Sequence, residues 1–301
     1  MRTTYRMMGI ADFITLTNGL LGVAAILFII LAVEDLQQPY SEGLRTKYIW
    51  ASMLCIFLSA LGDIIDGPIA RRYSKRRILG GSLDIMADSI SFCVAPALLM
   101  FMMFGRMGEA TPIWTISLAI ACGWIVATGM LRLARFAHEK GGESHYFSGL
   151  SSPGNALFLM SIGGLIWLQP STGLGPGLSV WDCDLCFGEG SPKPYFDWVI
   201  LPAMFVSGGL MISDVRMSKL KGGTALKLSV VQMALLLTAI IHGLVNASLT
   251  DSADDVSNTK YTAVFLTGSL ILCMSYMFAG EFWVRADERR MQAINQSSES
   301  E

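Results

Sequence analysis

The chain has 301 residues, a formal net charge of −2, 52% hydrophobic residues, 15% charged residues and a mean hydropathy of +0.50. Soluble globular proteins average about 25% charged residues, so this composition excludes an ordinary soluble protein and favours a membrane protein. Basic and aromatic residues do not alternate in the manner of a nucleic-acid-binding protein, and we expect no nucleic-acid partner.

Apolar stretches recur along the whole chain. A run of about 18 or more apolar residues is typical of a membrane-spanning helix. Eight segments approach this pattern: residues 10–33, 49–65, 83–104, 113–131, 155–168, 198–212, 228–249 and 262–282. The fifth is short and the sixth contains Pro202, so their boundaries are the least defined. The sequence predicts an all-α, multi-pass integral membrane protein with about eight transmembrane helices.

These segments divide the chain into three predicted parts. Residues 1–221 hold the first six segments, which form the main membrane domain. Residues 222–284 hold the last two, which follow the KLKGG turn as an additional transmembrane hairpin. Residues 285–301 end in the polar sequence NQSSESE and are predicted to be a disordered cytoplasmic tail.

Lys and Arg residues are unevenly shared between the connections. If the N-terminus is cytoplasmic, 17 of the 22 Lys and Arg residues fall on the cytoplasmic side. Cytoplasmic loops of membrane proteins are enriched in these residues, so we expect both termini to be cytoplasmic in a plasma-membrane protein. The basic loop at 71–77 then lies on the same side, where it would attract anionic lipid headgroups or an anionic substrate.

Two pairs of aspartates flank this basic loop. Asp63 and Asp66 are three residues apart, and Asp84 and Asp88 are four apart, so each pair shares a helix face. The short connection brings the two helix ends together, and four converging carboxylates repel one another at a membrane boundary. Hard cations such as Mg²⁺ or Mn²⁺ relieve this repulsion, which predicts a site for two ions.

Small and basic residues lie between the two acidic pairs. Gly67 and Gly80 would let a phosphate or nucleotide approach the backbone closely, and Arg71 offers a planar cation for a diphosphate. Alternatively, the acids cap helices and the basic run is a positive-inside anchor. Capping explains one or two acids but not two pairs at helical spacing, so we favour the metal site.

The complete pattern is D-x-x-D-G-x-x-A-R, then eight residues, then G-x-x-x-D-x-x-x-D. It resembles the signature of the CDP-alcohol phosphatidyltransferase family. All eight signature positions match: Asp63, Asp66, Gly67, Ala70, Arg71, Gly80, Asp84 and Asp88. The resemblance implies a six-helix core, a homodimer, and transfer of a phosphatidyl group from a CDP-linked lipid to an alcohol with release of CMP.

The resemblance also implies roles for single residues. One ion would bind to Asp63, Asp66 and Asp84. The second would bind to Asp84 and Asp88, and Asp88 would also take the proton of the attacking hydroxyl. The implied contacts to the CDP group come from Gly67, Ala70, Arg71, Arg77 and Gly80, with Thr15 and Asn18 in the first apolar segment.

Four further stretches resemble the phosphatidylserine synthase branch of this family: GGSLDIMADSISFCVAPALLM, LRLARF, FSGLSSPGNA and GLMISDVRMSK. Two positions depart from it. Ala11-Asp12 stands where the branch has Pro-Asn, and Ser151 stands where relatives usually have proline. The resemblance implies L-serine as the acceptor and CDP-diacylglycerol or CDP-archaeol as the donor.

A serine carboxylate needs a cationic partner. Arg132 and Arg135 are three residues apart at the end of the fourth segment, and Arg216 and Lys219 follow the sixth. All four are candidates, with membrane anchoring as the alternative. Glycerol 3-phosphate or inositol phosphate remains an alternative acceptor. A cation-coupled transporter is the alternative of a different class, and it predicts acids near the middle of the membrane.

Overall fold

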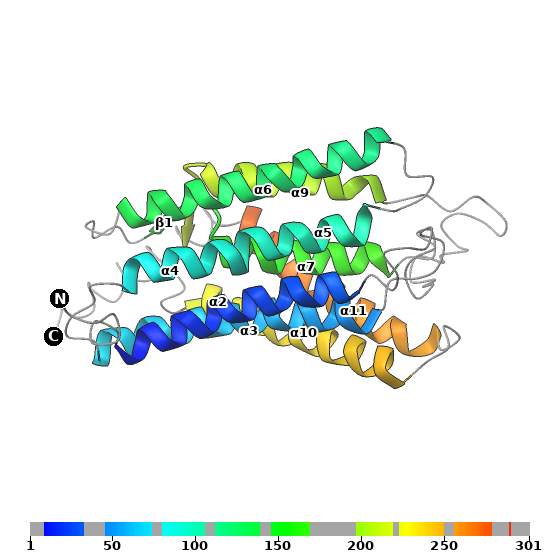
Figure 1. The fold of residues 1–301 in the computed structure, drawn as a ribbon, viewed down its shortest axis with the longest axis horizontal. Coiled ribbons are helices and arrows are strands. Elements are labelled where there is room, and N and C mark those ends of the chain that lie inside the picture. Colours follow the sequence, from blue (N-terminus) through cyan, green and yellow to red (C-terminus); the bar gives the residue numbers. More distant parts are fainter. Residues whose placement is uncertain are drawn as a thin grey trace.

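The structure, a computed structural model, describes residues 9–32, 46–73, 80–105, 112–138, 146–168, 197–218, 223–249 and 256–278, together with residue 289. Within these ranges the protein is helical, apart from one pair of three-residue strands. The helices run side by side along the long axis of the molecule (Figure 1). This confirms the predicted all-helical architecture.

Each predicted apolar segment corresponds to a helix or a chain of helical turns. The third segment is divided into α4 (Gly80–Asp88), the π-helical turn η1 (Ser89–Val94) and α5 (Ala95–Phe104). The sixth begins with the 3₁₀ turn η3 (Asp197–Val199). The remaining helices are α2 (Ile10–Leu31), α3 (Thr46–Tyr73), α6 (Pro112–His138), α7 (Ser152–Trp167), α9 (Ile200–Ile212), α10 (Gly223–Leu249) and α11 (Val256–Phe278).

Six of these units in the described part of the chain are long and apolar enough to cross a membrane. They are α2, α3, the α4–α5 unit, α6, α10 and α11. Large apolar side chains such as Leu20, Leu27 and Ile120 are exposed on them, as expected for surfaces that face lipid. The prediction of an integral membrane protein is therefore supported, with α7 and α9 shorter than a full span.

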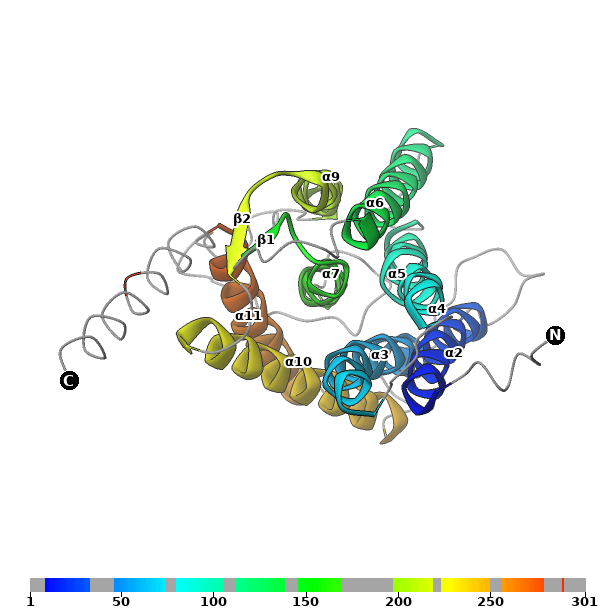
Figure 2. The same cartoon turned by 90° about the vertical axis from the view of Figure 1, so that its left-hand side faces the viewer.

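Helix α7 forms the centre of the bundle. Nearly all of its residues are buried, and it contacts α3, α5, α6, α9 and α11, which surround it in Figure 2. Trp167 near its end meets Trp50 of α3 edge to face, with ring centroids 6.3 Å apart. A helix enclosed in this way can be shorter than the bilayer, because its neighbours provide the surface that faces lipid.

A short strand pair ties the start of α7 to the end of α9. Strands β1 (Tyr146–Ser148) and β2 (Arg216–Ser218) are antiparallel, with Phe147 opposite Met217. The Gly149 N–H donates to the Val215 carbonyl at 2.8 Å. Gly149 has φ +75°, and a Cβ there would lie 2.6 Å from the Met211 carbonyl oxygen, so this position requires glycine.

Candidate active site

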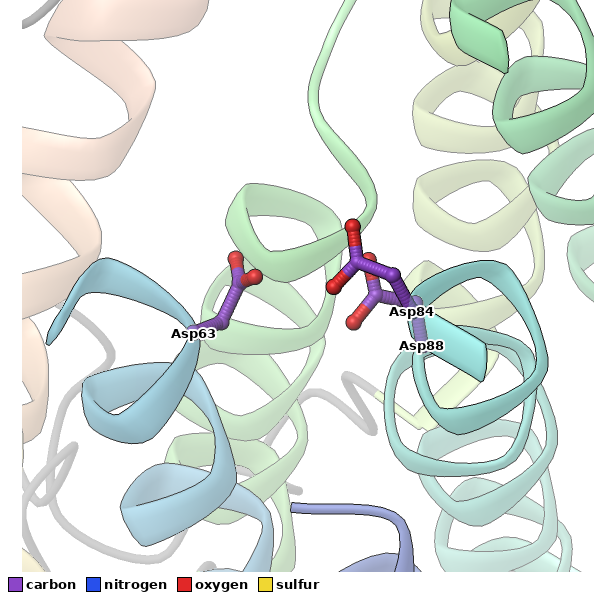
Figure 3. Close-up of side chains that lie close together, drawn as sticks. All are labelled: Asp63, Asp84 and Asp88. Atoms are coloured by element: carbon purple, nitrogen blue, oxygen red, sulfur yellow. The ribbon is translucent and has the colours of Figure 1, made fainter. Parts of the chain in front are cut away.

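Three of the predicted aspartates converge between two helices. Asp63 extends from α3, while Asp84 and Asp88 extend from α4, and the three side chains point toward one another (Figure 3). One carboxylate oxygen from each lies within 4.8 Å of the others, and all three residues are partly buried. The helical spacing of four therefore places Asp84 and Asp88 on one face, as predicted.

The remaining signature residues are described only in part. Asp66, Gly67, Ala70 and Arg71 lie on α3, and the structure does not describe their side chains. Gly80 is buried at the first position of α4, and Arg77 lies outside the described residues. The predicted second segment ended at residue 65, whereas α3 continues to Tyr73 because a helix can continue beyond the apolar stretch that crosses the bilayer.

The π-helical turn η1 begins directly after Asp88 and is fixed to α2. The Ser91 hydroxyl donates to the Asn18 carbonyl at 2.9 Å, and the Ser59 hydroxyl of α3 donates to the same oxygen at 3.1 Å. A Cβ added at Gly22 would lie 2.8 Å from the Ser91 Cα, so the two backbones are in close contact. These contacts hold α3 and α4 on a common support, and π-turns often occur at functional sites.

The two candidate residues on α2 are both buried beside this support. Thr15 is 1% exposed and Asn18 is 4% exposed. A Cβ added at Gly62, the residue before Asp63, would overlap the Asn18 side-chain oxygen. Asn18 therefore packs against α3 at the residue before Asp63. Asp12, which replaces the asparagine of the serine synthase branch, is also buried and accepts the Gly9 N–H at 2.8 Å.

The basic candidates for the acceptor differ in their surroundings. Arg132 is 5% exposed, and its guanidinium carbon lies 5.8 Å from the centre of the Phe136 ring. Arg135 forms an ion pair with Asp214, with 2.6 Å between Nη2 and Oδ1. Arg216 belongs to β2 and its side chain is not described, while Lys219 lies outside the described residues.

The donor set at the aspartates fits divalent cations. Carboxylate oxygens are the ligands that Mg²⁺ and Mn²⁺ prefer, and two-metal sites hold their ions about 3.5–4 Å apart. Three carboxylate oxygens within 4.8 Å of one another can act together as ligands. A cation placed among them would offset the repulsion between the carboxylates, so Asp63, Asp84 and Asp88 can hold a metal.

Two groups of residues at this site were missed by sequence analysis. Ser59 and Ser91 position the helices through the Asn18 carbonyl, and Ser152 and Asn155 are buried polar residues in the first turn of α7. The stretch FSGLSSPGNA, which contains the second pair, was identified by resemblance, but no single residue in it was assigned a role.

Comparison with known proteins agrees with this site. The family model described as CDP-alcohol phosphatidyltransferase matches residues 8–189, a range that includes all four aspartates of the signature. The CDP-diacylglycerol–serine O-phosphatidyltransferase of Saccharomyces cerevisiae is 31% identical over 156 residues, covering 49% of this chain and 51% of the relative. The protein of the same name from Methanocaldococcus jannaschii is 32% identical over 159 residues, covering 52% and 61%.

A further relative has a different lipid in its name. The archaetidylserine synthase of Methanothermobacter thermautotrophicus is 34% identical over 113 residues, covering 37% of this chain and 45% of the relative. The chain thus spans about half the length of the curated relatives it matches. Because the family model covers more than half of the chain and includes the converging aspartates, the chain belongs to the CDP-alcohol phosphatidyltransferase family.

Proposed function

We propose that the protein transfers a phosphatidyl or archaetidyl group from a CDP-linked lipid to the hydroxyl of L-serine and releases CMP, in phospholipid biosynthesis. The observation that carries this proposal is the convergence of Asp63, Asp84 and Asp88. The acceptor is inferred from the relatives, which are named as serine O-phosphatidyltransferases and an archaetidylserine synthase.

Four aspartates would hold the metal ions in this proposal. Asp63, Asp66 and Asp84 are assigned to one Mg²⁺ or Mn²⁺ ion, and Asp84 and Asp88 to the second. When bound, such ions neutralise the diphosphate and stabilise CMP as the leaving group. The described carboxylates support this assignment because three of them already face one another.

The chain itself would bind the nucleotide and move a proton. The serine hydroxyl oxygen bonds to the lipid-side phosphorus, and the bond from that phosphorus to CMP breaks. Asp88 accepts the proton that the serine hydroxyl loses. The closest backbone approach to the CDP group is assigned to Gly67 and Gly80. The other assigned contacts to the CDP group are Ala70, Arg71, Arg77, Thr15 and Asn18.

Arg132 is the basic residue whose described surroundings best suit a serine carboxylate. It is buried near the end of α6, where a charge–charge contact is little screened by water. Arg135 contacts the exposed carboxylate of Asp214, so a serine carboxylate would compete with that ion pair. Arg216 and Lys219 remain candidates on the segment that follows α9.

The setting proposed for this reaction is the cytoplasmic face of the plasma membrane. The lipid tails of CDP-diacylglycerol or CDP-archaeol would remain in the bilayer, and serine would arrive from the cytoplasm. The proposal divides the chain into a six-helix core over 1–221, an added hairpin over 222–284 and a cytoplasmic tail over 285–301. It also includes assembly as a homodimer. Helix α4 lies toward one end of the bundle rather than at its middle, which favours an interfacial enzyme over a transporter (Figure 1).

Release of CMP tests this function directly. The purified chain would be incubated with CDP-diacylglycerol, Mg²⁺ or Mn²⁺, and serine, glycerol 3-phosphate or inositol phosphate in separate reactions. We expect CMP to be released when serine is the acceptor and not with either phosphorylated acceptor. Release only with a phosphorylated acceptor would contradict the serine assignment but not the reaction. No release with any acceptor, from either CDP-diacylglycerol or CDP-archaeol, would contradict the reaction itself.

A further inference from the structure

The first turn of α7 contains buried polar groups with no partner in the described part of the chain. Asn155 is 0% exposed, and neither its side-chain oxygen nor its side-chain nitrogen forms a hydrogen bond there. The Ser152 hydroxyl is on a residue that is 2% exposed, and it also has no partner there. Native proteins rarely bury an amide in this way unless a ligand, an ion or water completes its hydrogen bonds.

The helix that carries these groups packs against the elements beside the aspartates. Helix α7 contacts both α3, which carries Asp63, and η1, which follows directly after Asp88. Figure 2 shows α7 between α3 and the α4–α5 unit, and Figure 3 shows its first turn behind the three carboxylates, between the helices that carry them. A molecule held at the first turn of α7 would therefore lie near the site proposed for phosphoryl transfer.

Capping of the start of α7 does not use the side chains of Ser152 and Asn155. The Ser151 hydroxyl caps the helix by accepting the Gly154 N–H at 3.2 Å, and Pro153 has no N–H. Ser152 and Asn155 therefore remain available after the helix has been capped. The same helix end carries the positive pole of the helix dipole, which favours an anionic group in this position.

A second polar residue of α7, farther along the helix, does have hydrogen-bond partners. The Ser161 hydroxyl donates to the Leu157 carbonyl at 2.9 Å and lies 2.9 Å from the Ser269 hydroxyl of α11. Asn155, also fully buried and two turns earlier, has no such partner in the described residues. Among the described residues, the buried side-chain atoms of α7 without a partner are those of Ser152 and Asn155 in its first turn and Trp167 Nε1 at its far end.

We propose that Asn155 and Ser152 bind the ammonium and carboxylate groups of the acceptor, an inference that rests on the proposed function. The Asn155 amide offers an N–H donor to a carboxylate and a carbonyl oxygen to an ammonium group. Ser152 adds one hydroxyl that can donate or accept. An α-amino acid uses all of these groups, whereas glycerol 3-phosphate and inositol phosphate have no ammonium group to donate to the Asn155 oxygen. The pair thus selects an amino-acid acceptor.

Binding of labelled L-serine separates this site from turnover. Serine would be titrated against the full chain in detergent micelles with CDP-diacylglycerol, once with EDTA and once with Mg²⁺. We expect Asn155→Leu, which retains the size of the side chain, to weaken serine binding and raise the KM for serine at least about a hundredfold, because two hydrogen bonds to charged groups are lost. The KM for CDP-diacylglycerol should change less than about twofold, because the proposed contacts are to the acceptor alone.

A matched control and the thermal stability distinguish binding from packing. Ser161→Ala removes a buried hydroxyl from the same helix and should leave serine binding unchanged. Asn155→Leu should not lower the midpoint of thermal unfolding without serine, since it removes buried groups that lack partners in the described part of the chain. A large loss of stability with no change in serine affinity would overturn the inference and indicate a structural role.

Substrate fragments test whether both charges are recognised. Ethanolamine lacks the carboxylate, and 3-hydroxypropionate lacks the ammonium group. Each should compete with labelled serine at least about tenfold more weakly than unlabelled serine does, because each loses a charged hydrogen bond. Equal competition by either compound would overturn the proposal that the site binds both groups.

The outcomes remain distinguishable from failure of the proposed function. Wild-type affinity for serine in Asn155→Leu overturns the inference, whether or not CMP is released. Binding of serine that depends on Asn155 supports the inference, and an absence of CMP release would then count against the proposed function alone. If Asn155→Leu does not fold, Ser152→Ala gives the measurement: about fivefold weaker binding supports the site, and unchanged binding overturns it.

Discussion

The aspartates between α3 and α4 and the α10–α11 hairpin both place polar side chains in an apolar bundle, but the two regions use side chains of different chemistry. His242 Nδ1 lies 2.8 Å from the Thr262 hydroxyl, and Asn246 lies 3.3 Å from the same ring nitrogen. Ser269 pairs with Ser161 of α7. Hydroxyl, amide and imidazole groups both donate and accept, so they form complete pairs without a ligand.

Carboxylates differ from these groups because they only accept hydrogen bonds when ionised and carry the same charge. Asp63, Asp84 and Asp88 lie close enough to repel one another, and none can donate to another while charged. Such a cluster is stabilised by a cation from outside it. Polar residues in a membrane bundle are therefore a sign of function when like charges gather, and not through their polarity alone.

The largest expected effect comes from Asp88→Asn. The substitution keeps the shape of the side chain but removes the proton acceptor and one metal ligand. We expect CMP release to fall about a thousandfold, within the range for loss of a general base. Its thermal midpoint in EDTA should not fall, since one repelling charge has gone. CMP release measured against Asp251→Asn, in the connection between α10 and α11, would provide the control.

Gly22→Val tests whether the π-turn positions Asp88. The new side chain would lie against Ser91, where even a Cβ comes within 2.8 Å of the backbone, and would push η1 away from α2. We expect CMP release to fall about a hundredfold, since a displacement of roughly 1 Å at a catalytic group has effects of this size. Overpacking should also destabilise the fold by about 1–3 kcal/mol.

Gly123→Val is the matched control for that prediction. Gly123 is also within a helix, but a Cβ there meets no atom within 4 Å. The same substitution should therefore leave CMP release within about twofold of wild type, because nothing is displaced. Equal loss of activity in the two variants would contradict a positioning role for the contact between α2 and η1.

The fold could be predicted from sequence as far as it depends on apolar length. All eight apolar segments correspond to helical units. A backbone in lipid has no water to bond to, and a helix satisfies its N–H and C=O groups internally. The π-turn after Asp88 was not foreseen, since it depends on Ser91 reaching the Asn18 carbonyl of another helix. The strand pair that joins Phe147 to Met217 is too short to leave a periodic pattern.

The candidate site shows the same division. Convergence of Asp63, Asp84 and Asp88 was predictable, because spacings of three and four define a helix face and the connection between the helices is short. Asn155 and Ser152 could not be singled out, because nothing in a sequence tells a buried polar residue with a partner from one without. Their neighbours become known only when α3, η1 and α7 are placed together.

Divalent ions should stabilise the aspartate cluster but not the hairpin. An ion present at ten times its Kd stabilises the folded state by about 1.4 kcal/mol, which for a chain of this length corresponds to a rise of roughly 2 °C in the thermal midpoint. We expect this rise when Mg²⁺ or Mn²⁺ is added to the EDTA-treated wild type, as measured by thermal unfolding in micelles. An equal rise in a variant with Asp63→Asn and Asp84→Asn would show that the ions bind elsewhere.

The smallest effect is expected at the paired hydroxyls that join α7 to α11 of the hairpin. Ser161→Ala and Ser269→Ala each remove one member of a buried pair, and interhelical hydrogen bonds in membrane proteins contribute about 0.6 kcal/mol on average. A double-mutant cycle should give a coupling free energy of that size, with CMP release within about twofold of wild type in all three variants. A hundredfold loss of CMP release in any of them would contradict the comparison, because the hydroxyl pair between α7 and the hairpin would then be as important for activity as the clustered carboxylates.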